Sequence, residues 1–205
     1  MQASSAAAPV SRSMNEATAC RLSTASSTCD RPSWGTGRCN GQMAALVAAD
    51  AALHRHLLTV DDLASSADHV VGPGSVLCRR VVELADGRAE SPGETRLREA
   101  LRWMGLVAIP QFRIEDGPFL ALVDFIVEEY QLAIEFDGFV KYGRLDRLAQ
   151  STRADIVMAE KIREDHIREL GQRFLRVIWR DMDELRALRR CIDSIIQRAA
   201  MHRSA

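Results

Sequence analysis

The segment Leu132-Ala133-Ile134-Glu135-Phe136-Asp137-Gly138 carries two acids within an otherwise apolar run. Its length, its apolar residues and its final glycine predict a buried β-strand. Because side chains alternate across a strand, Glu135 and Asp137 should share one face with Ala133, and the larger apolar residues should share the other. Burying two carboxylates is unfavourable unless positive charge meets them. A divalent metal ion near the strand end is the commonest reason for such an arrangement.

The composition sets limits on the size of the protein and on its partners. The 205 residues are enough for one domain, or for a domain with an appendage. The apolar fraction of 47% is ordinary for a globular protein, and the formal net charge of -1 gives no overall basic signal for nucleic acid. A polyanion would therefore have to bind through a local basic cluster or through bridging metal ions.

The cysteines indicate a reducing compartment. They are odd in number and form no Cys-x-x-Cys motif, so they support neither a disulfide framework nor a zinc site. We therefore expect a cytoplasmic protein. No apolar run is long enough to cross a bilayer, so no membrane partner is expected.

The chain before Ser91 is expected to contain no catalytic unit. Residues 1–41 are rich in Ser, Ala, Thr and Gly, which predicts disorder or a non-native start sequence. Residues 42–90 predict a small helical lead-in, with helices over 43–57, after a Thr59 cap, and over 76–85. The candidate core positions of the first helix are Leu46, Val47, Ala51, Leu53 and Leu57.

Residues 91–205 predict the main domain, which we expect to be of the α/β class. Ser91-Pro92-Gly93-Glu94 is a capping box that opens a helix to about Met104. Strands are expected over 111–115, 120–127, 131–137 and 173–179, a polar irregular segment over 138–152, and a last helix from Asp181 to about 199. The helix over 155–170 should face inward with Ala159, Ile162, Ile167 and Leu170. The resulting order, α-β-β-β-α-β, allows a mixed sheet with helices on its faces.

Three acids on neighbouring predicted strands could carry chemistry. Asp124 lies midway along the second strand, and Glu135 and Asp137 lie on the third. Phosphodiester hydrolysis needs an activated water and neutralisation of phosphate charge, and magnesium ions held by carboxylates supply both. Whether the three side chains share a face depends on the strand register, which the sequence leaves open.

Each acid also has a structural interpretation. Asp124 and Glu135 are either functional or paired with arginines in the core, because unpaired buried acids are rare. Asp137 precedes Gly138, and Asp-Gly is a common turn pair. Glu94 fits the reciprocal half of its capping box, besides a role as an accessory acid.

Four basic side chains follow the acidic strand. Lys141 could stabilise a phosphate or orient the attacking water, or it could be a solvated loop lysine. Lys161 is spaced for a helical i,i+4 pair with Asp165, which favours a solvated charged face. Arg163 and Arg176 could face a phosphate, although helical and strand surfaces carry many such arginines.

These motifs together resemble a known family. They are Ser91-Pro-Gly-Glu-Thr-x-x-Arg98, Val123-Asp124-Phe125, Ala133-Ile-Glu-Phe-Asp-Gly138, Lys141-Tyr142-Gly143-Arg144, Glu160-Lys161-x-Arg163-Glu164-Asp165 and Leu170-Gly171-x-x-x-x-Arg176. Over about residues 91–182 the chain resembles an actinobacterial domain-of-unknown-function family related to the very-short-patch-repair endonucleases. That family belongs to the restriction-endonuclease-like superfamily with its Asp…Glu-x-Lys pattern. Residues 43–89 resemble the region preceding this domain in abortive-infection-type antitoxins.

The resemblance implies a restriction-endonuclease-like αβββαβ core and a magnesium-dependent site, with Mn²⁺ as the other candidate ion. Asp124 and Glu135 would bind the metal, Asp137 would assist, Lys141 would contact the phosphate and Glu94 would match an accessory acid. Asp137 falls where the superfamily pattern has lysine, so Lys141 or Lys161 would have to supply that charge. Residues 1–41 do not resemble the winged-helix domain with which such antitoxin-like proteins often begin.

Three hypotheses follow from the sequence. The first is a metal-dependent endonuclease acting on DNA in defence or repair. The second is a catalytically degenerate nuclease fold that binds nucleic acid, or a toxin, in a defence or toxin–antitoxin system. The third is a regulatory fragment that does not act alone.

Overall fold

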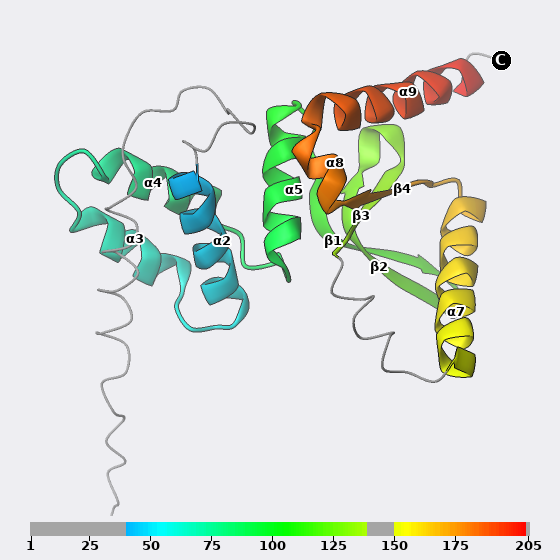
Figure 1. The fold of residues 1–205 in the computed structure, drawn as a ribbon, viewed down its shortest axis with the longest axis horizontal. Helices are drawn as coiled ribbons and strands as arrows, with labels where there is room; N and C mark the ends of the chain where they lie inside the picture. The colour runs from blue at the N-terminus through cyan, green and yellow to red at the C-terminus, as the bar shows by residue number, and fades with distance from the viewer. Residues whose placement is uncertain (1–39, 139–149, 204–205) are drawn as a thin grey trace, which may run out of the picture. The chain divides into compact units, whose positions relative to one another are not determined.

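The computed structural model describes residues 40–138 and 150–203, and the chain divides into two compact units between Glu90 and Ser91 (Figure 1). Residues 1–39, which belong to the segment predicted to be disordered or non-native, lie outside this range. Asn40 and Gly41 were included in that prediction, but they begin a helix. No helix in the described part of the chain combines the length and the apolar character needed to span a membrane.

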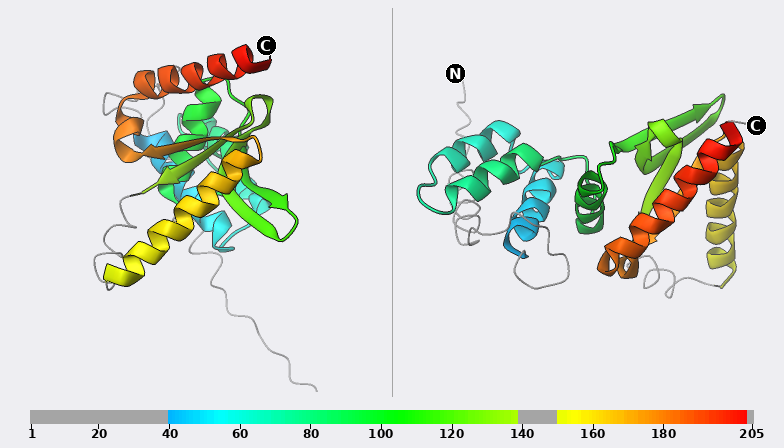
Figure 2. Two further views of the ribbon diagram at one scale, coloured as in Figure 1. Left: turned by 90° about the vertical axis from the view of Figure 1, so that its right-hand side faces the viewer. Right: turned by 90° about the horizontal axis from the view of Figure 1, so that it is seen from above.

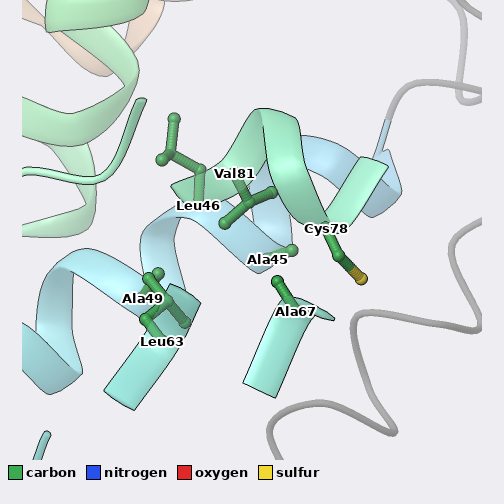
Figure 3. Close-up of a cluster of buried hydrophobic side chains, with 7 residues drawn as sticks. All are labelled: Ala45, Leu46, Ala49, Leu63, Ala67, Cys78 and Val81. Atoms are coloured by element: carbon green, nitrogen blue, oxygen red, sulfur yellow. The ribbon is translucent and has the colours of Figure 1, made fainter. Parts of the chain in front are cut away.

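The first unit contains the three predicted helices, α2 (Asn40–His54), α3 (Val60–Asp68) and α4 (Ser75–Leu84). The predicted cap of α3 is confirmed, since the Thr59 hydroxyl accepts a hydrogen bond from the Asp62 main chain. One face of each helix contributes to a shared core (Figure 3), formed by Ala45, Leu46, Ala49, Leu63, Ala67, Cys78 and Val81. Leu57 was predicted to join a core, but it lies beyond the end of α2 and is exposed.

The second unit is a mixed α/β domain whose element order matches the predicted α-β-β-β-α-β. It runs through α5 (Pro92–Trp103), β1 (Ile109–Asp116), β2 (Phe119–Val127), β3 (Leu132–Asp137), α7 (Gln150–Glu169) and β4 (Arg173–Ile178). A short 3₁₀ helix, η1 (Glu128–Tyr130), joins β2 to β3. The four strands form one sheet in chain order, with antiparallel neighbours except for β4, which is parallel to β3.

Helix α5 begins as the sequence predicts. The Ser91 hydroxyl accepts a hydrogen bond from the Glu94 main chain at 3.2 Å, and Pro92 occupies the first turn. Leu97 and Leu101 on this helix and Met104 at its end are buried. Gly105, at φ 76°, follows the end of the helix in the left-handed conformation that favours glycine.

Helices α5 and α7 lie on opposite sides of the sheet (Figures 1 and 2). The ring of Phe136 packs against α5 at Gly93, whereas the carboxylate of Glu135 is bound by a side chain of α7. This confirms the alternation predicted for β3. On the α7 side, Ile167 packs with Ala133 in a cluster of buried residues from β1, β2 and β3.

Two predictions for the helices of this unit are wrong. Helix α7 begins at Gln150, within the segment expected to be irregular, and Ala159 and Ile162 on it are exposed instead of facing inward. The expected last helix is two helices, α8 (Trp179–Asp183) and α9 (Leu185–Arg203). Glu184 separates them with a non-helical ψ of 57°, and Asp181 lies within α8, where it accepts a hydrogen bond from the Ile178 main chain.

Candidate functional site

A row of polar residues crosses the sheet. Glu135 on β3 pairs in register with Arg176 on β4. Continuing the β2–β3 register by one residue puts Asp124 beside Glu135, and the β1–β2 register puts Gln111 beside Asp124. The adjacent row in register is apolar throughout and consists of Pro110, Phe125, Ile134 and Leu175.

Asp124 is held against β3 by a main-chain hydrogen bond. Its Oδ2 atom accepts the N–H of Phe136 at 2.7 Å. The regular β2–β3 pairing ends at Phe125 and Ile134. Beyond that point the side chain of Asp124, and not a main-chain carbonyl of β2, accepts the N–H of Phe136. Phe136 lies between Glu135 and Asp137 in the chain. The Asp124 carboxylate therefore lies beside the part of β3 that carries both acids.

Both carboxylate oxygens of Glu135 are paired with arginines. Oε1 accepts a hydrogen bond from Arg163 at 2.6 Å, and Oε2 accepts one from Arg176 at 3.4 Å. Glu135 itself is buried. Of the two interpretations of this residue that the sequence left open, pairing with arginine is the arrangement seen.

Helix α7 supplies further acids to these arginines. The Oε1 atom of Glu160 accepts hydrogen bonds from Arg163 at 2.9 Å and from Arg176 at 2.8 Å, and Glu164 lies 3.3 Å from Arg176. Burial disfavours the charged form of Arg163, but hydrogen bonds to Glu160 and Glu135 outweigh this effect and raise the pKa of its guanidinium above the usual value. Arg163 therefore stays charged at any physiological pH.

Asp137 is less completely paired. Its Oδ2 atom lies 3.9 Å from the Nη1 atom of Arg176. Its Oδ1 atom is buried and has no hydrogen-bond partner among the described residues. Arg176 is thus within ion-pair distance of both acids of β3. We call Glu135, Asp137, Glu160, Glu164, Arg163 and Arg176 the ion-pair cluster.

Glu94 connects α5 to the first strand. Its Oε1 atom accepts a hydrogen bond from the Ser91 hydroxyl at 2.7 Å, and Oε2 accepts one from the Gln111 side chain at 3.2 Å. Gln111 has a positive φ of 51°, which is uncommon for a residue other than glycine. Sequence reasoning missed Gln111, because a glutamine after a proline carries no signal for such a role.

The structure describes only one of the two lysines. Lys141, expected to contact a phosphate, lies outside the described residues. Lys161 is exposed on α7 and makes no ion pair within the described ranges. This agrees with the solvated charged face that the sequence favours; the pair with Asp165 that the spacing permits is not formed, and Asp165 lies 3.8 Å from Arg168.

The donor chemistry of the site suits a hard cation, but the arrangement does not. Carboxylate oxygens are the ligands that Mg²⁺ and Mn²⁺ prefer. Yet no group of three or more His, Cys, Asp or Glu residues in ranges 40–138 and 150–203 is placed to hold a metal ion. Glu135, the central candidate ligand, presents both of its oxygens to guanidinium groups. As they are placed, these residues do not fit a metal ion.

Comparison with protein-family models, curated proteins and solved structures finds no match to this chain. The family resemblance therefore stays a prediction, and the functional argument rests on the geometry of the polar row and the ion-pair cluster.

Proposed function

We propose that residues 91–205 form a restriction-endonuclease-like domain that hydrolyses DNA phosphodiester bonds with a divalent metal ion, Mg²⁺ or Mn²⁺, in the cytoplasm. The observation that carries the proposal is the meeting of carboxylates at the end of β3. The Asp124 carboxylate accepts the N–H of the residue that separates Glu135 from Asp137.

Two further features support this proposal. Carboxylates on adjacent strands of one sheet are costly to bury, and a role at a functional site would account for that cost. The α-β-β-β-α-β order with a mixed sheet is also the order that the family resemblance implies. Because the acids as placed do not fit a metal ion, we assign no step of the reaction to them.

Plasmid cleavage tests the proposal. We expect the purified full chain to nick supercoiled plasmid DNA in the presence of Mg²⁺ or Mn²⁺. Glu135→Ala and Asp124→Ala should lower the rate by roughly a hundredfold or more, the usual loss when one preorganised polar group is removed from an active site.

Glu115→Ala provides the matched control. Glu115 is an exposed acid on β1 whose partner is Arg113, and it takes no part in the polar row contacts. Its removal should leave the rate unchanged. Absence of cleavage with either metal ion, or cleavage by Glu135→Ala at the wild-type rate, would contradict a hydrolytic role.

A second candidate function has its own supporting observation. Both oxygens of Glu135 are neutralised by arginines, as expected of a degenerate nuclease scaffold that binds DNA or a toxin without cutting. For such a module, DNA should bind with a steep dependence on salt concentration and without a metal requirement. Co-purification with a toxin or another defence-system protein, again without cleavage, would favour the same alternative.

A further inference from the structure

The exposed side of α9 carries positive charge that no acid balances. Figure 1 shows this helix at the edge of the second unit. Arg186, Arg190 and Arg198 are exposed on it, and none of them makes an ion pair or a hydrogen bond through its side chain with a described residue. We call these three arginines the basic face of α9. The other exposed side chains that the structure describes on this helix are uncharged and are those of Cys191, Ser194, Gln197 and Met201.

Helical periodicity explains why the three arginines reach solvent. The fully buried residues of α9 recur at spacings of three and four and form one apolar stripe, Leu185, Leu188 and Ile192. Successive residues of a helix are turned by about 100°, so the basic face lies on the side of α9 opposite this stripe. The stripe packs α9 onto the unit, and the basic face is therefore left to solvent.

The acids nearest to the basic face do not neutralise it. Asp193, within α9, accepts hydrogen bonds from Arg189, whose guanidinium also donates to the main-chain carbonyl of Met104. Asp183 and Glu184 are exposed just before the helix, where they complement the positive end of its dipole. Neither forms an ion pair with the basic face. Its three charges therefore remain available to a partner.

A polyanion is the partner that complements this face. A helix advances about 1.5 Å per residue, so Arg186 and Arg198 lie about 18 Å apart along the axis of α9. Duplex DNA carries one negative charge per about 1.7 Å of its own axis, so several phosphates fall within that reach. Guanidinium groups also match the geometry of phosphate oxygens. A membrane surface suits α9 less, because the apolar stripe that would enter the lipid is buried in the protein.

We propose that the basic face of α9 binds the phosphate backbone of duplex DNA and holds the duplex on the second unit. This inference rests on the proposed function in taking DNA as the partner, but it requires no hydrolysis. The basic face is separate from the ion-pair cluster, and its action needs no metal ion. Because its contacts go to phosphates, it positions DNA without reading the sequence.

The salt dependence of DNA binding counts these contacts. Binding of a short, fluorescently labelled duplex to the full chain is followed by anisotropy, in EDTA and at about 50 to 200 mM potassium chloride. The logarithm of the binding constant should fall linearly with the logarithm of the salt concentration. Arg190→Gln/Arg198→Gln should bind more weakly and reduce the magnitude of the slope by about 2, since each phosphate contact contributes about 0.9.

Two controls separate contact from overall charge. Arg113→Gln/Arg168→Gln removes the same charge from β1 and α7, where these arginines already pair with Glu115 and Glu164. This control should keep the wild-type slope. Arg190→Lys/Arg198→Lys preserves both charges on the basic face and should keep the slope as well.

Each outcome decides the inference separately from the proposed function. Equal slopes for Arg190→Gln/Arg198→Gln and the wild type overturn the inference, whatever the plasmid assay gives. An equal loss of slope in Arg113→Gln/Arg168→Gln also overturns it, because overall charge would then explain the effect. Binding to anionic phospholipid vesicles without any binding to DNA would assign the face to a membrane instead. Binding through the basic face without plasmid cleavage leaves the inference standing and rejects the hydrolytic function.

Discussion

Gly93 lies where α5 meets the sheet, in a position that leaves no room for a side chain. A Cβ atom on Gly93 would lie 1.9 Å from the Cε1 atom of Phe136. The Phe136 ring is itself held edge-on against Trp179, with 4.8 Å between the ring centroids. Gly93→Ala should therefore lower the free energy of unfolding by about 1–3 kcal/mol, the usual cost of overpacking. Urea unfolding followed by tryptophan fluorescence measures the change.

Gly138→Ala is the control for this substitution. A Cβ atom on Gly138 would lie 3.6 Å from the same ring, which is an ordinary contact, so the expected change is within about 0.5 kcal/mol. Adding Phe136→Leu to Gly93→Ala should recover part of the lost stability. Equal stability of Gly93→Ala and the wild type would show that the ring can move aside at no cost.

At the residue scale, the sequence predicts where the acids lie but not what they bind. The alternation within β3 is local, so the face that carries Glu135 could be predicted from seven consecutive residues. Its partners come from far along the chain, with Arg163 and Arg176 separated from it by 28 and 41 positions. Both arginines were candidates for contacting a phosphate, but no local pattern could indicate that they pair with Glu135.

At the scale of the element, α7 has two dissimilar halves. Its C-terminal half packs on the sheet through Ile167, which is fully buried, and the partly buried Leu170 packs there just after the helix ends. Ile162 is 62% exposed, and the apolar residues Ile156, Val157 and Met158 before it are exposed too. The inward face predicted for the whole helix is therefore correct only near its C-terminal end.

Paired truncations on α7 test this division. Ile167→Ala should lower the free energy of unfolding by about 2–5 kcal/mol, because it removes buried methyl groups and leaves a cavity. Ile162→Ala makes the same chemical change on the exposed half and should cost less than about 0.5 kcal/mol. Urea unfolding of both variants gives the comparison. A similar large loss for both would mean that the N-terminal half of α7 is packed in solution.

Whether a segment forms a helix or a strand could be predicted more fully than the residues at which it begins and ends. The caps at Thr59 and Ser91 are local hydrogen-bonding patterns, and both are found where the sequence predicts them. The break between α8 and α9 at Glu184 has no such signal, because glutamate is a good helix former and neither glycine nor proline is nearby. A break of this kind depends on tertiary packing, here on the burial of Met182 and Leu185 on either side of Glu184.

For the whole molecule, the division between Glu90 and Ser91 predicts that residues 91–205 fold without the first unit. This unit contains its own sheet, its own buried residues and the helix cap at Ser91. The free energy of unfolding of a 91–205 fragment should match that of the same unit in the full chain within about 0.5 kcal/mol, as independent sites usually do. Circular dichroism and urea unfolding provide the measurement.

A fragment that starts at Leu106 is the control, because it lacks α5 and with it the buried Leu97 and Leu101. Without that helix one face of the sheet is exposed, so this fragment should not unfold cooperatively. The described candidate residues of the site, from Glu94 to Arg176, all lie within 91–205. The fragment should therefore retain any DNA cleavage by the full chain. A folded 91–205 fragment that no longer cleaves DNA, when the full chain does, would contradict this prediction.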